Sequence, residues 1–509
     1  MKQVTNNAFP KPQPSISLCM IVKNEANLLP ACLESVARSV DEIILVDTGS
    51  TDETIPIAER FGAAVIRHPW NNHFAEARNA ALERASGSWI LFLDADERLY
   101  EYELEQLRSY AQLTQPEGFF LQVWNHSSNN PAEDTIVRNP IIRMFRNRPE
   151  HRFTGRIHEQ ITTSITTHNP EAIFHMTNVI IHHYGYLKEQ VVSKDKVHRN
   201  TSLLTDALAE DPHNPFIQFN LAVEHMRSGN ISAALDLLLQ ASEQLNARTS
   251  YYHLVLKYII LCHIQLQKWS EAITVCNEGI SQYPEYTDLR EQKAACLRLT
   301  GRPEQAVTVL LEALRFGPPP AHFHSETGTG TYLTCYALGQ SYEALSDDLQ
   351  AIQWYTQALE HHPNWLLPLQ RVVRLFKCAK EPEGLARYIV QFLARYSDLN
   401  IQSIQELLVA EGCFEALHRP SLREMLPSSL QTSVLSMIEE YCTGNRTTAF
   451  QQLNIFRRTE DSADSSAVAI VLQQWADSRL AELEATPPYG RLLRSTRLAL
   501  PFLVLGGLS

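Results

Sequence analysis

The sequence predicts an α/β domain with a doubly wound, mostly parallel sheet, followed by an all-α solenoid of paired helices. Two observations predict this architecture. Up to about residue 185, short β-branched runs alternate with amphipathic segments, which is typical of parallel strands joined by crossover helices. From about residue 200, strand patterns vanish and Leu- and Ala-rich helical segments recur at a regular spacing. A chain of 509 residues is long enough for two or three domains.

The composition divides the chain into four segments. We predict a flexible N-terminus at 1–14, the α/β domain at 15–195, the helical solenoid at 196–380, and a helical C-terminal region of diverged repeats or a cap at 381–509. The last segment ends in an apolar run, Leu498–Leu508. Because Pro501 interrupts this run, packing onto the solenoid is favoured over a membrane-surface helix.

Charge and cysteine usage exclude several classes of protein. Lys and Arg number 44 and Asp and Glu 57, a net charge of −13, which disfavours nucleic-acid binding because that affinity rests on excess cationic charge. The sequence has neither a signal-peptide pattern nor the ~20 consecutive apolar residues of a transmembrane helix. The nine cysteines include no Cys-x-x-Cys pair, so no disulfide framework or zinc knuckle is indicated and we expect a cytoplasmic protein.

Strands and helices alternate in the first hundred residues. The predicted strands are Ile16–Val22, Glu42–Val46, Ala63–Ile66 and Trp89–Leu93, and the predicted helices are Asn27–Arg38, Asp52–Phe61 and Ala75–Ala85. Ser50 and Glu53 have the spacing of a capping box, which predicts a helix start just after the Gly49 turn. Ligands of such sheets bind beyond the carboxyl ends of the strands, so residues after Val46 and Leu93 are expected in a binding site.

The helical half repeats itself. A small residue recurs in the second helix of each predicted pair, at separations of 38, 34 and 45 residues: Ala234, Ala272, Ala306 and Ala351. Three of these are followed twelve residues later by a helix-stopping proline, namely Pro284, Pro318 and Pro363. The pattern, clearest from Gly339 to Pro363, resembles the tetratricopeptide repeat, a helix-turn-helix solenoid. The Gly- and Pro-rich segment Phe316–Thr331 is expected to be a loop between two repeats.

An acidic motif follows the fourth predicted strand. Side chains two residues apart in an extended segment point the same way, so Asp94 and Asp96 can converge on one hard cation whose open positions take phosphate oxygens. For an isolated pair of this kind, a solvated strand end that caps the next helix would be the favoured interpretation, but here the pair belongs to an ordered series. The other members are Val22-Lys23-Asn24-Glu25, Asp47-Thr48-Gly49 and Phe74-x-x-Ala77-Arg78-Asn79.

This series resembles the family 2 glycosyltransferases of the Rossmann-like GT-A fold, over about residues 15–185. The resemblance implies a nucleotide-sugar donor, with a UDP-sugar as the first candidate, and a divalent cation, Mg²⁺ or Mn²⁺. It implies that Asp47 contacts the nucleobase or ribose, that Arg78 lies on the donor side, and that Asp94 and Asp96 bind metal and diphosphate. Val22, Asn24, Glu25 and Ala95 complete the implied donor site. Turn formation with Gly49 is the alternative for Asp47, and a surface salt bridge is the alternative for Arg78.

A second cluster lies downstream, where six of the 19 histidines fall between residues 151 and 183. We interpret Glu159 as the catalytic base, His158 as its neighbour in catalysis and His183 as a metal ligand. The family's usual acidic pair after the metal motif is missing, so Glu159 is a substitute assignment. For His182 and His183 the alternative is a place on a buried strand, hydrogen-bonded to backbone.

The whole set resembles the branch of family 2 that carries tetratricopeptide repeats, including the bacterial sublancin-type peptide S-glycosyltransferases. The resemblance implies an inverting transferase whose repeats select a peptide or protein acceptor, and leaves a homodimer open. Two alternatives remain: a lipid or saccharide acceptor with repeats that serve oligomerisation, and a non-catalytic repeat scaffold that binds nucleotide. The polar stretch Asn125–Glu133 is expected to be a mobile loop over the donor or the acceptor.

Overall fold

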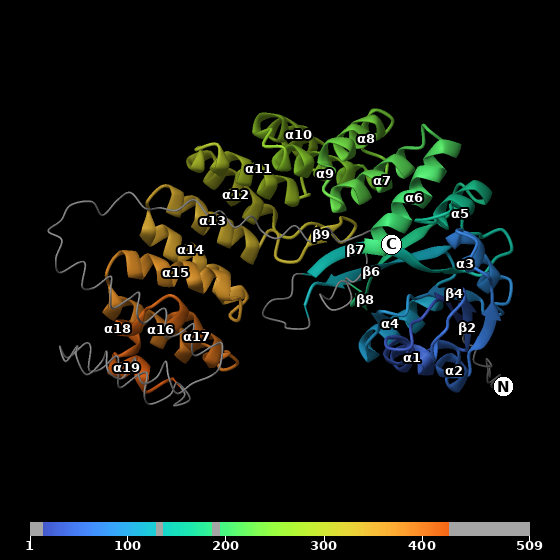
Figure 1. The fold of residues 1–509 in the computed structure, drawn as a ribbon, viewed down its shortest axis with the longest axis horizontal. Coiled ribbons are helices and arrows are strands. Elements are labelled where there is room, and N and C mark those ends of the chain that lie inside the picture. Colours follow the sequence, from blue (N-terminus) through green and yellow to red (C-terminus); the bar gives the residue numbers. More distant parts are fainter. Residues whose placement is uncertain (1–13, 129–135, 186–193, 427–509) are drawn as a thin grey trace, which may run out of the picture. The chain divides into compact units, whose positions relative to one another are not determined.

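The computed structural model describes residues 14–128, 136–185 and 194–426 (Figure 1). The chain divides into two compact units: the first runs to Thr300 and takes in Arg315–Gly330, and the second contains Gly301–Leu314 and the helices after Thr331. The predicted boundary at 195/196 coincides with the start of helix α6 (Lys194–Glu210) but falls inside the first unit. The α/β domain and the first helices of the solenoid therefore form one body.

Among the described residues, the first unit contains a single nine-stranded sheet with the order β3-β2-β1-β4-β7-β6-β8-β5, in which β9 also pairs with β7. The strands are β1 (Ile16–Val22), β2 (Glu42–Asp47), β3 (Ala64–Arg67), β4 (Trp89–Phe92), β5 (Glu97–Arg98), β6 (Gly118–His126), β7 (Ile136–Arg146), β8 (Phe174–His183) and β9 (Ser325–Glu326). The four predicted strands are confirmed and pair in parallel. Beyond them the sheet is mixed, because β7 runs antiparallel to β4, β6 and β9.

Helices cover both faces of the parallel strands. They are α1 (Leu29–Val36), α2 (Thr54–Arg60), α3 (Phe74–Leu82), α4 (Glu101–Ala111) and α5 (Thr162–His168). Alternate strand residues face opposite layers: Leu18 and Met20 pack with α1 in one buried cluster, whereas Cys19 lies in the other, with residues of α3 and α5.

The predicted capping box is wrong, because α2 begins at Thr54 without a side-chain cap. Ser50 Oγ instead accepts a hydrogen bond from the Asn24 backbone N–H (2.9 Å), and Asp52 Oδ2 accepts one from the Ala26 N–H (3.1 Å). These polar side chains thus connect the loop after β2 to the loop after β1. The Ser50-to-Glu53 pattern resembled a capping box because hydrogen bonds between loops use the same polar residue types as a helix cap.

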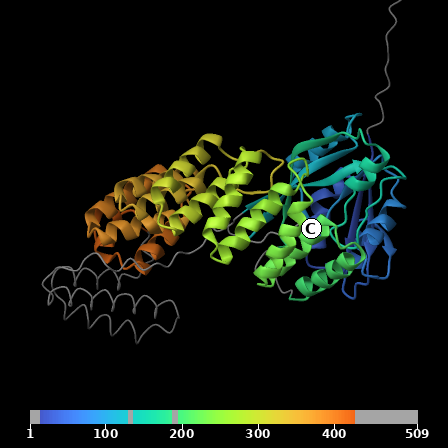
Figure 2. The same ribbon diagram turned by 90° about the horizontal axis from the view of Figure 1, so that it is seen from above.

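Beyond α6 the helices form antiparallel pairs, which Figure 2 shows from above. The pairs are α7 (Pro215–Arg227) with α8 (Ile231–Glu243), α9 (Tyr252–Gln265) with α10 (Trp269–Gln282), α13 (Tyr332–Ala344) with α14 (Asp348–His361), and α15 (Leu366–Cys378) with α16 (Pro382–Arg395). In sequence, α11 (Asp288–Leu299) and α12 (Pro303–Phe316) come between α10 and α13, and α17 (Ile401–Ala410), α18 (Phe414–Leu417) and α19 (Pro420–Arg423) follow α16. The four predicted alanines are fully buried on second helices, and α10, α12 and α14 each end two residues before a predicted proline. The repeat pattern is confirmed, although it missed the pair α15–α16. The apolar run Leu498–Leu508 lies outside the described residues.

The predicted loop between α12 and α13 contains a strand. We call residues 317–330 the strap. In the first unit, its β9 pairs with β7 through Glu326 opposite Val137 and Ser325 opposite Arg138. The other side of the strap contacts the repeats: the Phe323 ring stacks on the Tyr286 ring with centroids 4.7 Å apart. The strap therefore joins the first repeats to the sheet.

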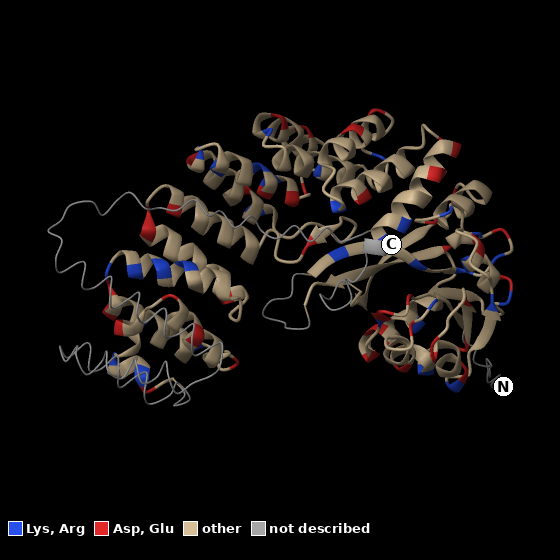
Figure 3. Cartoon of the chain, viewed as in Figure 1, with Lys and Arg blue, Asp and Glu red and all other residues tan. Residues whose placement is uncertain are grey.

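Ion pairs connect neighbouring repeats in the second unit. Figure 3 shows a row of basic residues on α15. Arg371 pairs with Glu343, Arg374 binds Glu411 Oε1 at 2.7 Å, and Lys377 Nζ donates to the Glu411 carbonyl oxygen at 2.5 Å. This row is therefore matched by acidic or carbonyl partners on adjacent helices.

Within the three described stretches of chain, no helix combines the length and apolar character needed to cross a bilayer. The cysteines there are free thiols, and most are buried.

Candidate active site

Three loops meet at the carboxyl edge of the parallel strands, after β1, β2 and β4. Val22 lies opposite Asp47 in the β1–β2 register, so both end at this edge. Asn24 adopts a left-handed conformation (φ 57°), and its Oδ1 accepts from the Thr51 N–H at 2.8 Å. The Glu25 N–H donates to Thr54 Oγ1 at 2.7 Å. The first two loops are thus held together by side chain to backbone hydrogen bonds.

Asp47 forms the turn after β2. Its buried carboxylate accepts hydrogen bonds from the backbone N–H groups of Gly49 and Ser50, both at 3.1 Å. The turn-forming interpretation is therefore confirmed. A donor contact of Asp47 stays a prediction.

Five charged side chains of alternating sign lie together at the end of β4; we call them the ion-pair chain: Glu159, Arg78, Asp94, Arg143 and Glu97. Arg78 Nε binds Glu159 Oε1, and Arg78 Nη2 lies 3.5 Å from Asp94 Oδ1. Arg143 Nη2 binds Asp94 Oδ2 at 3.0 Å and Glu97 Oε1 at 2.6 Å. Arg78 is buried, so the surface salt bridge predicted as its alternative is wrong. The side chain of Asp94 is 24% exposed, against 4% for Arg143, so Asp94 presents this chain of charges to solvent.

The arginines set the charge of Asp94. Burial alone would raise the pKa of Asp94, but Arg143 and then Arg78 hold that pKa well below its usual range. Burial raises the pKa of Glu97 to about 7 despite the opposing charge of Arg143. Neither Arg143 nor Glu97 was assigned a role from the sequence. Asp94 is consequently ionised throughout the neutral range.

Asp96 and His183 face each other beside this chain. His183 Nε2 lies 3.2 Å from Asp96 Oδ2, and His183 Nδ1 lies 2.7 Å from Asn125 Oδ1. Asn125 Nδ2 donates to the Val137 carbonyl oxygen at 3.2 Å, which orients the amide so that its oxygen accepts from Nδ1–H. In the neutral imidazole, the lone pair of His183 Nε2 then faces the Asp96 carboxylate, and the two groups repel each other. A second proton on the imidazole, or a cation between the two groups, offsets this repulsion.

The geometry at Asp96 and His183 fits two protein ligands of a divalent cation. A side chain at Gly185 would collide with Asp96 Oδ2 and come within 2.7 Å of His183 Nε2, so glycine keeps this space open. Within residues 14–128, 136–185 and 194–426 no cluster of three or more His, Cys, Asp or Glu side chains is arranged to hold a metal. Asp94 instead binds its two arginines. Diphosphate oxygens and water would supply the remaining ligands of the cation.

Glu25 adds to the negative charge at this edge. Burial, and next the charge of Asp96, raises the pKa of Glu25 to about 7. Ala95, between the two aspartates, is buried. The predicted donor-site residues of all three loops thus lie along one edge of the sheet.

The predicted catalytic residues belong to a closed loop, residues 154–160. Thr154 and Gln160 pair across its neck, with N–O distances of 3.1 and 3.0 Å. His158 lies within the loop in a left-handed conformation (φ 52°), and Glu159 contacts Arg78. The structure thus brings Glu159 to Arg78, while the donor-side role of Arg78 and the role of Glu159 as a base stay predictions.

Two expectations about neighbouring residues are corrected. His182 and His183 both lie in β8, but each has a side-chain partner: the rings of His182 and His126 are joined by an Nδ1–Nε2 contact of 3.0 Å. The interpretation as strand histidines bound only to backbone is therefore wrong. The predicted loop Asn125–Glu133 begins inside β6, because Asn125 continues the strand to reach His183, and residues 129–133 lie outside the described chain.

Residues 17–173 match the model of the glycosyl transferase family 2. The N-terminal domain is a family 2 glycosyltransferase domain. The predicted resemblance to this family is thereby confirmed.

Three relatives match parts of this chain. A TPR repeat-containing protein of Synechococcus elongatus is 35% identical over 255 residues, which are 49% of this chain and 61% of the relative. The SPbeta prophage-derived glycosyltransferase SunS of Bacillus subtilis is 29% identical over 258 residues, 50% of this chain and 60% of the relative. A PGL/p-HBAD biosynthesis glycosyltransferase of Mycobacterium tuberculosis is 41% identical over 96 residues, 17% of this chain and 38% of the relative. The chain matches about 60% of the length of the first two relatives.

Proposed function

We propose that the protein is an inverting, cation-dependent glycosyltransferase that moves a sugar from a nucleotide-sugar, first of all a UDP-sugar, to a peptide or protein acceptor. The observation that carries the proposal is the juxtaposition, in a family 2 domain, of the ionised Asp94 and the Asp96–His183 pair at the carboxyl edge of the sheet. Such an edge is where open α/β sheets bind nucleotides.

In this proposal the donor lies along the three loops. Val22, Asn24, Glu25, Asp47 and Ala95 line the nucleotide side. A divalent cation, when bound, supplies positive charge to the departing diphosphate.

The Asp96 carboxylate and His183 Nε2 hold that cation, and Asn125 keeps the imidazole oriented. Asp94, proposed from its motif as a further ligand, is held by Arg78 and Arg143, so the geometry favours a role for it in ordering these arginines around the diphosphate.

Glu159 accepts a proton from the attacking group of the acceptor as that group attacks the anomeric carbon from the face opposite the diphosphate. His158 lies beside Glu159 in this step. Glu159 is bound to Arg78. A diphosphate oxygen that binds Arg78 would replace Glu159 there and release the carboxylate for the acceptor. Donor binding would thus prepare the base.

The paired helices support a polypeptide acceptor, because such repeats offer extended binding surfaces. A lipid or saccharide acceptor is the second candidate, favoured by the relative named for PGL/p-HBAD biosynthesis. A non-catalytic scaffold is disfavoured by the ion-pair chain, since burying two arginines and three acids is costly without a use for them.

The test incubates the full chain with a panel of nucleotide-sugars and Mn²⁺ and measures nucleotide release, with mass spectrometry of candidate peptide and glycolipid acceptors. We expect release with at least one donor, and its loss on addition of EDTA and in Asp96→Ala. Asp41→Ala is the matched control, since Asp41 is a carboxylate paired with Arg108 ahead of β2. Turnover that survives both chelation and Asp96→Ala would contradict the cation assignment.

A further inference from the structure

One helix, α3, holds the loop that carries Glu159. The side chain of Asn79 makes two hydrogen bonds with the backbone of Phe153: Nδ2 donates to the Phe153 carbonyl oxygen at 3.0 Å, and Oδ1 accepts from the Phe153 N–H at 2.9 Å. The Phe74 N–H donates to the Arg156 carbonyl oxygen at 2.8 Å. With the Arg78–Glu159 pair, the helix contacts the loop at three successive places.

The two Asn79 bonds lie just before the neck of the loop. Phe153 precedes Thr154, which pairs with Gln160 to close the loop. An amide that binds both the N–H and the C=O of one residue fixes the position and the orientation of that backbone, as a neighbouring strand would. Buried alanines of α3, Ala77 and Ala81, pack in the core against the sheet, so the loop is tied to a rigid element.

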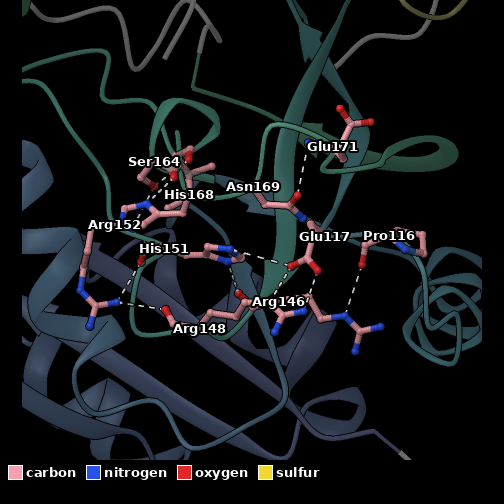
Figure 4. A network of polar contacts seen from close by, with 11 residues as sticks. Pro116, Glu117, Arg146, Arg148, His151, Arg152, Ser164, His168, Asn169 and Glu171 are labelled. Carbon is pink, nitrogen blue, oxygen red and sulfur yellow. Dashed lines mark hydrogen bonds and ion pairs between the residues drawn. The ribbon is translucent and has the colours of Figure 1, made fainter. Parts of the chain in front are cut away.

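A separate network fixes the chain before the neck (Figure 4). Arg148 makes two bonds with Glu117, at 2.7 and 2.6 Å, and His151 Nδ1 lies 2.8 Å from the Arg146 carbonyl oxygen. Arg146 pairs with Trp89 at the amino end of β4, whereas Asp94 follows the carboxyl end. This network therefore anchors the connection at the edge opposite the ion-pair chain.

We propose that Asn79 is a positioning residue, whose two-point bond to Phe153 sets where loop 154–160 places Glu159 and His158 relative to Asp94. The effect on turnover rests on the proposed function. The effect on the loop does not, and can be measured without any substrate.

The test compares Asn79→Ala with Asn147→Ala in the full chain. Asn147 is the matched control because its Nδ2 also donates two hydrogen bonds to backbone, to the Ala85 and Gly87 carbonyl oxygens at 2.9 Å. It lies beside Arg148 of the Glu117 network, and not at the neck of loop 154–160. We expect Asn79→Ala to lower kcat by about 100-fold, since small misplacements of a reacting group have effects of this order, with the donor KM changed less than about threefold. Asn147→Ala should leave kcat within about threefold of the parent.

Hydrogen exchange reports on the loop directly. Exchange of the Phe153, Thr154 and Gln160 amides should be at least about tenfold faster in Asn79→Ala, and unchanged in Asn147→Ala. If Asn79→Ala fails to fold, Asn79→Asp keeps the acceptor for the Phe153 N–H, removes the donor to its carbonyl, and should show the same changes at smaller size.

A double-variant cycle asks whether Asn79 acts through Glu159. In a Glu159→Gln background, Asn79→Ala should lower kcat by less than about threefold further. Equal losses of kcat in Asn79→Ala and Asn147→Ala, or unchanged exchange in Asn79→Ala, would overturn the inference. If the parent turns over no nucleotide-sugar, the proposed function fails, while hydrogen exchange still decides whether Asn79 fixes the loop.

Discussion

At the scale of single residues, the uncharged Asn125 orients a histidine of the proposed cation site. It fixes the tautomer of His183, so that Nε2 faces Asp96. We expect Asn125→Leu to weaken Mn²⁺ binding in the presence of UDP by roughly 10–100-fold, the usual effect of losing a partner of a metal-binding histidine. Isothermal titration calorimetry measures it. Asn125→Asp, which keeps an acceptor for Nδ1–H, should recover most of the affinity, and equal weakening in both variants would contradict this role.

Glu25 gives the site a pH dependence. Its folded-state pKa of about 7 lies above the ~4.3 of an unfolded chain, so proton binding favours the folded state, and stability falls as pH rises from about 4.5 to about 7. Glu25→Gln should therefore raise Tm, relative to the parent, more at pH 8 than at pH 5 in EDTA. Thermal unfolding followed by circular dichroism checks this. An equal difference at both pH values would show that Glu25 does not hold its proton in the fold.

The candidate site was predictable where neighbours in sequence are neighbours in space. Asp94, Asp96 and Arg78 follow strand ends or a helix start, and the parallel order brings them to one edge. Arg143 was given no role because its partners are Asp94, just after β4, and Glu97, in β5, and no local pattern reveals this pairing. The one sequence signal for Arg143 was its position inside the apolar run Ile141–Phe145, because a guanidinium buried there requires a buried acid as its partner.

At the scale of elements, the small residues of the repeats permit close helix contacts. A Cβ on Gly339 would collide with the ring of Tyr355, which is fully buried and donates its hydroxyl to Glu343 Oε2 at 2.8 Å. We expect Gly339→Ala to destabilise the second unit by about 1–3 kcal/mol through overpacking, although alanine favours helix. Chemical denaturation measures the loss. In a Tyr355→Ala background the same change should be neutral or stabilising, and a persisting loss would place its cause elsewhere.

The elements themselves divide into those with a local signal and those without. Strands β1 to β4 and the helix pairs were predicted because alternation and the alanine period are local. The remaining strands pair antiparallel or across long insertions, and β9 consists of only two residues inside a segment rich in Gly and Pro. Neither length nor periodicity could identify it.

At the scale of the whole molecule, the strap makes the first repeats part of the unit that contains the sheet. A chain of residues 1–330 keeps the strap and its contacts with β7, Tyr286 and Asp288, whereas a chain ending at 195 lacks them. We expect the shorter chain to unfold at a lower temperature and to expose to exchange the amide of Arg138, which lies on the β9 side of β7. Phe323→Ala in the full chain tests the strap without truncation, and should speed exchange of the same amide. Identical Tm values for 1–195 and 1–330 would show that the strap carries no stability.

The strap also has a consequence for synthesis. Gln122 Nε2 binds the Ala321 carbonyl oxygen, a partner 199 residues later in the chain. A ribosome that adds roughly 5–20 residues per second needs roughly 10–40 s to make that stretch, so for that time the nascent sheet lacks the β9 partner of Val137 and Arg138, beyond the part of β7 that pairs with β4. An unpaired strand edge is a template for other chains. Stalled or prematurely terminated products keep that edge permanently, and strand addition between them is the route by which they would aggregate.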